Sequence, residues 1–569
     1  MESSKGSSDA LNTLNASAPT QISASTQISA STQIDAPEPI SSAPTSAEPV
    51  PTSAAAKPSK YSSMIRRSKY PSRWRLLTSS IAVIVSVSIM LAYFVLDFCD
   101  ILPGPLTLRV QHISTPVSSP RTLLPADSSI KGISYGKTID SSRAQQIIDK
   151  FMSDPSISDN TSVIIMDAKG KVIASHEADT PREPASTLKT LTAAVASRTL
   201  DMGSTLDTQV FLQPKSHKNS KKSSSIGVRN IVLRGNGDML LGVGENDWHH
   251  TNGRAGLTTL ASRTANALKL DNISEVSLEV DDSLFGAKRA PALVYETDNE
   301  RRFYAETSSM AIDDARQRDL ALQGVDPDNI TDFPLSDPTP ALSVGNRFAK
   351  LLVEQGIKVQ NFDTENSQNS QNSAIPVSKT HPLIANNSKL LAKVSSAPLN
   401  EVMAYMLRIS DNTLAEEFGR LTALAVNKKN SPEGAVQAVE EGLRKLKVDI
   451  SGLHMSDCSG LSPKSRVRVA TLAKIQLLNL QANSGGAASS EGLSLPGLVG
   501  TSRKRLTDVS NAGLMRVKTG SLDEVSSMTG NVSRKSGGAL TFAVVANQPI
   551  DFWGAFVAIN KFMGELPNL

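Results

Sequence analysis

The chain has 569 residues, of which 39% are hydrophobic and 20% are charged, and its formal net charge is +4. This length exceeds one ordinary domain and allows at least one large buried core. The modest net charge owes much to a basic cluster before residue 76, which argues against nucleic-acid binding. The two cysteines, Cys99 and Cys458, exclude a disulfide framework, and the seven histidines show no metal-ligand spacing. We therefore expect a globular protein without a metal or another cofactor.

The N-terminal part of the chain differs in composition from the rest. Residues 1–56 are rich in Ser, Thr, Ala and Pro, so they cannot offset their ordering entropy and are predicted to be disordered. Seven cations between residues 57 and 75 precede the uncharged run 76–96, which as a helix would span roughly 32 Å, about the thickness of a bilayer core. The positive-inside rule then places residues 1–75 in the cytoplasm. We expect a transmembrane helix over 76–96 and an extracytoplasmic stalk over 97–140.

The predicted secondary structure begins at residue 141, and helices and strands alternate. A helix over 141–152 precedes strands 162–166 and 171–175, which flank a turn and indicate a hairpin. Polar loops are expected at 215–225 and 361–373. A glycine turn after strand 231–234 lacks the third glycine and the lysine of a phosphate loop. The remaining elements are a helix over 258–268, a strand over 276–280, a helical segment over 400–424, strands at 514–517, 525–532 and 539–546, and a closing helix over 551–565.

Ser186 and Lys189 stand at the start of an apolar helical run, 191–200. Residues three apart on a helix share a face, with Cβ atoms roughly 5–6 Å apart, so the amine can take the proton of the hydroxyl. A Ser-Lys pair can replace a Ser-His-Asp triad. The same spacing occurs at Ser128/Lys131 and Ser134/Lys137, but in a segment that glycines interrupt. Only the context favours Ser186, and a surface serine with a solvated lysine is the alternative.

Two further polar motifs interrupt apolar segments. Ser410-Asp411-Asn412 lies in the middle of the helical segment 400–424, where capping or a kink between helices is the simpler explanation. The same tripeptide at residues 158–160 precedes a strand as an ordinary turn. Lys518-Thr519-Gly520-Ser521 continues a strand near the C-terminus. A strand edge with a lysine, a hydroxyl and a glycine can bind a carboxylate while its backbone pairs with an extended peptide.

The order Ser-x-x-Lys, Ser-Asp-Asn, Lys-Thr-Gly resembles the three signatures of penicillin-binding proteins and serine β-lactamases. The longer segments PASTLKTLTAAVA, SDNTLAEEFGRL, SDCSGLSPKSRV, GLVGTSRKRL and GLMRVKTGSL are similar to the class C low-molecular-mass D-alanyl-D-alanine carboxypeptidases. The resemblance covers roughly residues 140–569. It implies an α/β (α+β) fold of the penicillin-binding protein/β-lactamase type, in which helices flank an antiparallel sheet. The expected parts are a catalytic domain over 141–204 and 341–569 and an inserted subdomain over 205–340.

The resemblance also implies the role of each motif residue. Ser186 would attack the penultimate carbonyl of a D-Ala-D-Ala stem peptide, and Lys189 would remove its proton. Ser410 would relay a proton to the departing D-alanine, and Asn412 would hold the substrate amide. Lys518 and Thr519 would bind the terminal carboxylate, Gly520 would leave room for the substrate, and the backbone N–H groups of Ser186 and Ser521 would form the oxyanion hole. β-Lactam antibiotics would acylate Ser186.

Two departures from the family pattern stand out. Cys458 replaces the first glycine of the D-G-S-G-L-S pattern, which would disturb the turn if that position needed a positive φ. Only a short polar stretch, 311–340, remains where a second insert subdomain is expected, so we predict one insert subdomain.

Two kinds of alternative to a carboxypeptidase remain, enzymes with the same catalytic residues and an inactive protein at the same location. A DD-endopeptidase or a β-lactamase would use the same site, and an inactive wall-binding ectodomain would use none of it. The expected location is the cell membrane, with the catalytic domain outside the cytoplasm, and the expected partners are peptidoglycan stem peptides rather than nucleic acid.

Overall fold

The computed structural model describes residues 85–88, 90–96, 136–215, 228–318, 326–330, 332–363, 374–506 and 511–569. The chain divides into two compact units, Met1–Arg121 and Thr122–Leu569, and every element named below belongs to the second.

Several predicted features lie outside the described residues. They are the disordered tail 1–56, the basic cluster before residue 76, the stalk as far as residue 135, Cys99, Ser128, Lys131 and Ser134, and most of the two polar loops. Of the predicted membrane span, residues 76–84 and 89 also lie outside, whereas 85–88 and 90–96 are helical. Within the part of the chain that the structure describes, no helix has both the length and the apolar character that a membrane crossing requires.

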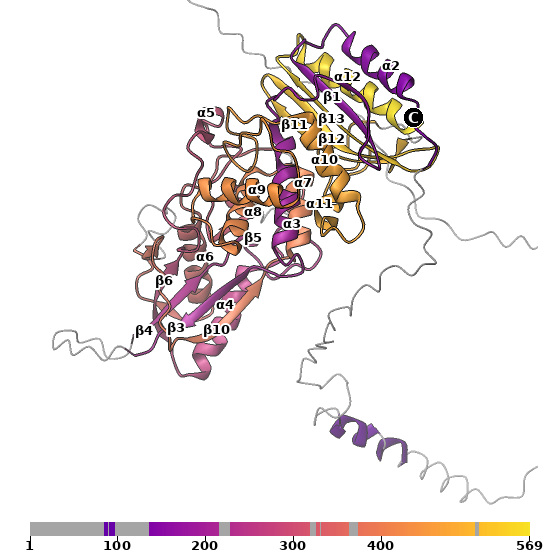
Figure 1. Cartoon of the computed structure of the whole chain (residues 1–569). Helices are drawn as coiled ribbons and strands as arrows, with labels where there is room; N and C mark the ends of the chain where they lie inside the picture. Colours follow the sequence, from indigo (N-terminus) through magenta and orange to yellow (C-terminus); the bar gives the residue numbers. More distant parts are fainter. Residues whose placement is uncertain are drawn as a thin grey trace, which may run out of the picture. The chain divides into compact units, whose positions relative to one another are not determined.

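A five-stranded antiparallel sheet is built from strands at both ends of the catalytic region (Figure 1). The predicted hairpin is confirmed at its edge, where β1 (Thr161–Asp167) pairs with β2 (Val172–His176). The three predicted C-terminal strands are confirmed as well, and β13 pairs with β1. In spatial order the strands are β11 (Met515–Leu522), β12 (Val525–Ser533), β13 (Ala539–Asn547), β1 (Thr161–Asp167) and β2 (Val172–His176).

Both faces of this sheet are covered by helices. In β1, Val163 and Ile165 contribute to one hydrophobic core and Ile164 and Met166 to another, as the alternation of side chains along a strand requires. The first core lies against α2 (Ser141–Met152) and α12 (Phe552–Glu565), and the second includes residues of α10 (Val469–Leu480). Both outer helices have an aspartate at the N-cap, Asp140 for α2 and Asp551 for α12, whose side chain accepts hydrogen bonds from the first backbone N–H groups.

A group of helices adjoins the second face of the sheet. The α3 helix (Lys189–Thr199) is buried for most of its length and packs against its neighbours α8 and α9. The predicted helical segment 400–424 is two helices, because the chain turns sharply at Ser410. The members of this group are α3, α7 (Leu399–Ile409), α8 (Asn412–Ala425), α9 (Pro432–Lys445) and α11 (Ala487–Glu491).

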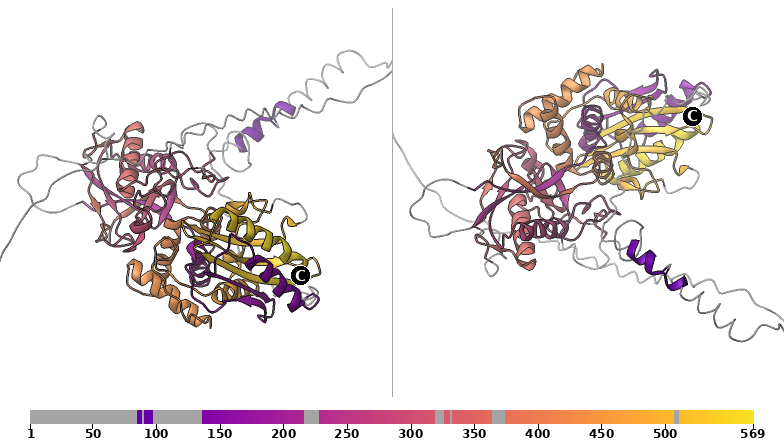
Figure 2. Two further views of the ribbon diagram at one scale, coloured as in Figure 1. Left: turned by 90° about the horizontal axis from the view of Figure 1, so that it is seen from above. Right: turned by 90° about the horizontal axis from the view of Figure 1, so that it is seen from below.

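The inserted region contains a six-stranded mixed sheet with two helices packed on it, seen apart from the five-stranded sheet in both views of Figure 2. Its helices are α4 (Leu257–Leu270) and α6 (Pro340–Glu354), and its strands are β3 (Asp207–Leu212), β4 (Arg229–Arg234), β6 (Glu275–Asp281), β8 (Lys358–Val359), β9 (Val377–Ser378) and β10 (Lys389–Ser395). The boundary expected at residue 340 therefore lies inside this packing unit. Because β10 pairs with β3, the inserted region extends to Ser395 rather than ending at residue 340.

The described part of the inserted region also contains short elements. They are β5 (Asp238–Leu241), α5 (Val294–Thr297), β7 (Met310–Ile312) and η2 (Asp313–Ala315). β5 and β7 pair with each other as a two-stranded sheet.

Candidate active site

Ser186 lies in the short 3-10 turn η1 (Ala185–Leu188), directly before α3. Ala185 has a φ of +49°, a left-handed conformation that is uncommon for residues other than glycine. The turn is tied to the sheet, because Ser527 Oγ on β12 donates a hydrogen bond to the Pro184 carbonyl at 2.7 Å. Ser186 is thereby fixed between a buried helix and the edge of the five-stranded sheet.

The Lys189 ammonium is fully buried and surrounded by three acceptors. Its Nζ lies 2.9 Å from Ser186 Oγ, 2.6 Å from Asn412 Oδ1 and 2.9 Å from the Ser459 carbonyl oxygen. The amide and the carbonyl fix the position of the amine, so that it faces the serine hydroxyl. This is the contact that proton transfer from Ser186 to Lys189 needs.

The charge of Lys189 is set by opposing effects. Burial lowers the pKa of Lys189 to about 8, while the carboxyl groups of Asp457, Asp411 and Glu416 oppose that shift. A lysine with a pKa near 8 is neutral in roughly a tenth of molecules at pH 7, whereas a solvated lysine is neutral in fewer than about one in a thousand. Lys189 therefore has the charge properties of a general base.

The second motif forms the sharp turn between α7 and α8. Ser410 has a φ of +64° and ends α7, and Asp411 accepts a hydrogen bond from the Leu414 N–H and caps α8. Asn412 is the first residue of α8, and its Nδ2 donates to the Phe303 carbonyl at 2.9 Å. The motif therefore does cap a helix and reverse the chain, as the structural alternative to a catalytic role predicted. The same turn also directs Ser410 and Asn412 toward the two lysines.

The third motif lies within β11 rather than after it. Val517 exchanges backbone hydrogen bonds with Ser494, on the side away from β12. Because hydrogen-bonding direction alternates along a strand, the backbone groups of Thr519 and Ser521 face the same outer edge. The N–H of Ser521 consequently faces the space beside Ser186 rather than the sheet.

Lys518 connects the third motif to the second. Its Nζ lies 2.8 Å from Ser410 Oγ and 2.7 Å from the Thr519 carbonyl oxygen. Burial, together with the charges of Lys189 and Arg505, lowers the pKa of Lys518 well below its ordinary value. The two motif lysines are therefore electrostatically linked, and each opposes the charging of the other.

Gly520 and Thr519 shape the edge of β11. A methyl group added at Gly520 would lie 2.3 Å from Ser527 Oγ and 3.0 Å from the Ser186 nitrogen, so only glycine fits between the strand and the η1 turn. Thr519 Oγ1 lies 2.7 Å from Thr501 Oγ1, which adds a second hydroxyl beside Lys518. Thr501 was not predicted as a site residue.

The structure brings the residues of all three motifs into one place. Ser186, Lys189 and Asn412 form one hydrogen-bonded group, and Lys518 and Ser410 form a second. The two groups adjoin, because Ser410 and Asn412 share one turn. The short motifs alone could not predict that residues 186, 410 and 518, which are far apart in the sequence, lie close together.

A supporting turn from the segment DCSGLS was not predicted as part of the site. The Asp457 carboxylate accepts hydrogen bonds from the N–H groups of Ser459, Gly460 and Ser462 at 2.9, 2.6 and 2.6 Å. The turn presents the Ser459 carbonyl to Lys189. The family-like segment was the only signal for this role, because a backbone carbonyl has no signature of its own in a sequence.

Cys458 does not disturb that turn. The φ of Cys458 is not positive. The next glycine along the chain, Gly460, has a φ of +81° and packs against the Ala185 carbonyl. Cys458 is a buried free thiol, and its N–H donates to the Glu416 carboxyl. Burial raises the pKa of Glu416 to about 8. The substitution of the usual first glycine is therefore compatible with the backbone conformation found here.

The described residues contain no group of three or more His, Cys, Asp and Glu side chains arranged to hold a metal ion. His250, in the only adjacent histidine pair of the sequence, lies beside the carboxylates of Asp247 and Asp326 at 2.6 and 3.7 Å.

Comparison with known proteins assigns the chain to a family. The model of the D-Ala-D-Ala carboxypeptidase 3 (S13) family matches residues 144–318 and 315–555, which is more than half of the chain. The chain belongs to this family. A carboxypeptidase of Mycobacterium tuberculosis is 30% identical over 65% of this chain and 72% of its own length. The carboxypeptidase DacB of Mycolicibacterium smegmatis is 30% identical over 64% of this chain and 72% of its own length.

The fold of this S13 carboxypeptidase has a counterpart among solved structures. Penicillin binding protein 4 from Haemophilus influenzae matches with a TM-score of 0.57 and 18% identity, over 76% of this chain and 100% of that one. The predicted fold of helices around an antiparallel sheet, with an inserted region, is thus confirmed. The resemblance drawn from the three motifs is confirmed by the family.

Proposed function

We propose that this S13 family protein hydrolyses the terminal peptide bond of peptidoglycan stem peptides ending in D-Ala-D-Ala, through an acyl-enzyme on Ser186. The observation that carries the proposal is the contact of the buried Lys189 amine with Ser186 Oγ at 2.9 Å, beside the Lys518–Ser410 pair. The family supplies the reaction class, and the geometry supports the role of each residue.

In the acylation step, Ser186 Oγ attacks the carbonyl carbon of the penultimate D-alanine while its proton passes to Lys189. The backbone N–H groups of Ser186 and Ser521 stabilise the oxyanion, and such a donor contributes roughly 10²–10³-fold in rate in other hydrolases. The C–N bond then breaks, and the leaving nitrogen takes a proton through Ser410. A water molecule afterwards attacks the ester, which releases the shortened peptide and restores Ser186.

The two lysines have different charges in this mechanism. Lys518 faces the terminal carboxylate of the substrate together with Thr519, and a bound carboxylate favours the charged form of Lys518. A charged Lys518 in turn favours a neutral Lys189, because both amines are buried in the same site. Substrate binding therefore promotes the base form of Lys189. Asn412 Oδ1 accepts from Lys189 and one Nδ2 hydrogen goes to the Phe303 carbonyl, so the second Nδ2 hydrogen is the one that can contact the substrate amide.

The acylation rate is expected to rise with pH. The neutral form of Lys189 accepts the proton of Ser186, so the rate should increase as pH rises through about 8, the pKa of Lys189, and should level off above it. Stopped-flow measurement of acylation by a chromogenic penicillin between pH 6 and 9.5 tests this expectation. A rate that is constant from pH 6 to 8 would contradict it.

Product analysis tests the proposed substrate. The protein should release one D-alanine from a pentapeptide that ends in D-Ala-D-Ala, and it should form a long-lived acyl-enzyme with penicillin. Rapid turnover of penicillin with no release of D-alanine would instead indicate a β-lactamase. Cleavage of a cross-linked dimer without release of D-alanine from the pentapeptide would indicate an endopeptidase.

We also propose that the protein is anchored in the cell membrane by residues 76–96 and that the catalytic region lies outside the cytoplasm. The support is the basic cluster before an uncharged apolar run, together with a substrate that lies outside the membrane. A reporter enzyme that is active only outside the cytoplasm should be active when fused after residue 130 and inactive when fused after residue 60. Equal activity of the two fusions would refute this topology.

A further inference from the structure

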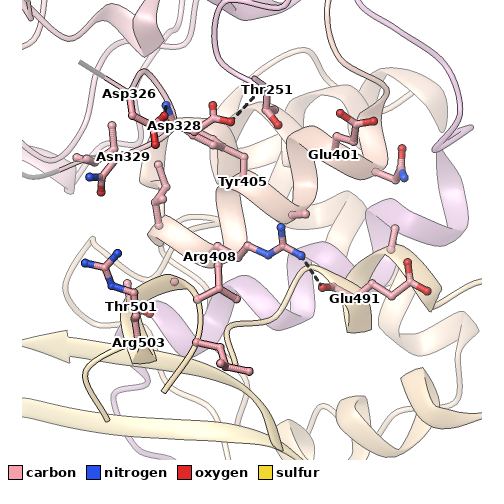
Figure 3. Close-up of a pocket in the computed structure, with 18 of the residues that line it drawn as sticks. Thr251, Asp326, Asp328, Asn329, Glu401, Tyr405, Arg408, Glu491, Thr501 and Arg503 are labelled. Atoms are coloured by element: carbon pink, nitrogen blue, oxygen red, sulfur yellow. Dashed lines mark hydrogen bonds between the residues drawn. The ribbon is translucent and has the colours of Figure 1, made fainter. Parts of the chain in front are cut away.

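A cavity of about 800 Å³ adjoins the candidate site at Thr501, which is labelled in Figure 3. One wall is α7, with Arg408 and Ile409 at its C-terminal end. The other walls are the segments 498–504 and 326–330. The cavity is much larger than the methyl side chain of alanine requires, so the proposed reaction does not account for it.

The cavity borders the catalytic residues at two points. Thr501 lines it and also contacts Thr519 Oγ1 at 2.7 Å. Ile409 lines it and directly precedes Ser410. Thr519 and Ser410 belong to the side of the proposed site that faces the departing residue. A side chain of the leaving residue that is longer than a methyl group would therefore point toward this cavity.

One wall of the cavity is positively charged and has no carboxylate partner. Arg408 is half-buried, its Nε is buried without an acceptor, and its Nη2 donates only to the Glu491 carbonyl at 3.3 Å. Arg516 reaches the same carbonyl oxygen, at 3.5 Å. Arg503 and Lys504 line the cavity too (Figure 3 labels Arg503). Arg516 does not itself line the cavity. Within the described residues, none of the three cations that do line it forms a salt bridge.

Four acidic residues also line the cavity, namely Asp326, Asp328, Glu401 on α7 and Glu491. Asp328 accepts from two backbone N–H groups, of Thr251 and Asn252. Glu401 is paired with Arg254 at 2.7 Å. Asp326 accepts from the Asp328 N–H. The carboxylate of the exposed Glu491 points away from the Arg408 guanidinium (Figure 3). Arg408 therefore has no carboxylate partner among the described residues, and an added anion can pair with it.

We propose that this cavity is a leaving-group subsite in which Arg408 binds a side-chain carboxylate of the departing residue. The inference rests on the proposed carboxypeptidase reaction and names a substrate preference of the same site. Arg408 acts as a specificity-determining residue, and it takes no part in proton transfer to or from Ser186. Its charged side chain favours a leaving residue that carries a side-chain carboxylate over a neutral leaving residue of equal size.

The test compares two substrates with the same acyl part and isosteric leaving residues, D-glutamate and D-glutamine. For the wild-type protein, kcat/KM should be roughly tenfold higher with D-glutamate, the effect expected of a hydrogen bond to a charged group, and the difference should lie mainly in KM. Arg408→Gln should remove the preference and Arg408→Lys should keep part of it, each read as the ratio of the two kcat/KM values within one variant. Release of D-alanine from D-Ala-D-Ala shows that each variant is folded and active.

Arg444→Gln, a change in an exposed ion pair on α9, is the control and should keep the full preference. Equal kcat/KM for the two substrates in the wild type would overturn the subsite, as would a preference that survives in Arg408→Gln. Absence of D-alanine release from D-Ala-D-Ala by the wild type would overturn the proposed function itself. The two failures are therefore distinguishable.

Discussion

Replacing Lys189 with alanine is expected to slow the acylation of Ser186 by roughly 10²–10⁴-fold, the usual contribution of a general base. The hydroxyl of Ser186 contacts the Lys189 amine at 2.9 Å, so the variant loses the proton acceptor beside the nucleophile. The rate is measured with a chromogenic penicillin under single-turnover conditions. The variant should also lose the rise in rate near pH 8 that the Lys189 pKa produces.

A loss of folding must be separated from this loss of chemistry. Lys189→Ala leaves the acceptors Asn412 Oδ1 and the Ser459 carbonyl without their buried donor, which itself costs about 1–3 kcal/mol per unsatisfied group. Urea unfolding gives the fraction of folded protein, and the acylation rate is then expressed per folded molecule. Acylation of the folded variant at the wild-type rate would show that Lys189 is not the base.

Replacing Arg316 with alanine is expected to destabilise the protein by about 3–5 kcal/mol, the usual result of removing one partner of a buried ion pair. The Arg316 guanidinium contacts the carboxylates of Asp411 and Asp314, and the Asp411 side chain is only 1% exposed. Without Arg316, the Asp411 carboxylate would be left in a buried position with less compensation. The free energy of unfolding is obtained from urea titration monitored by circular dichroism.

The same variant should lose activity, because Asp411 caps the helix that begins with Asn412, a contact of Lys189. Arg444→Ala is the matched control, since it removes an exposed i,i+4 ion pair with Glu440 and should change stability by less than about 0.5 kcal/mol. A change below about 1 kcal/mol for Arg316→Ala would mean that the buried network does not hold the second motif in place.

Local patterns predicted much of the sheet and its helices. The hairpin of β1 and β2, the three C-terminal strands and the helices α2 and α12 follow from alternation and from helical periodicity. The end of the inserted region was harder to predict from the sequence, because the strands β8, β9 and β10 are short or distant in sequence from their partners. Lys389 pairs with Leu212 across a long segment of chain, and no local pattern reports such a pairing.

The side chains of the candidate site were predictable, whereas their support was not. The hydroxyl, amine and amide groups of residues 186, 189, 410, 412 and 518 belong to recognisable motifs. The Ser459 carbonyl, the positive φ of Ala185 and the contact of Thr501 with Thr519 depend on backbone geometry and on tertiary packing. Such contacts have no residue-type signature, so they emerge only from the folded chain.

Labelling with a fluorescent penicillin is the most direct test of Ser186 as the nucleophile. The wild-type protein should be labelled covalently, and Ser186→Ala should not be labelled, because no other hydroxyl contacts the Lys189 amine among the described residues. Ser134→Ala is the matched control, since Ser134 heads another Ser-x-x-Lys match in the sequence, and it should be labelled like the wild type. Covalent labelling of Ser186→Ala, or an unlabelled wild type, would contradict the assignment of Ser186.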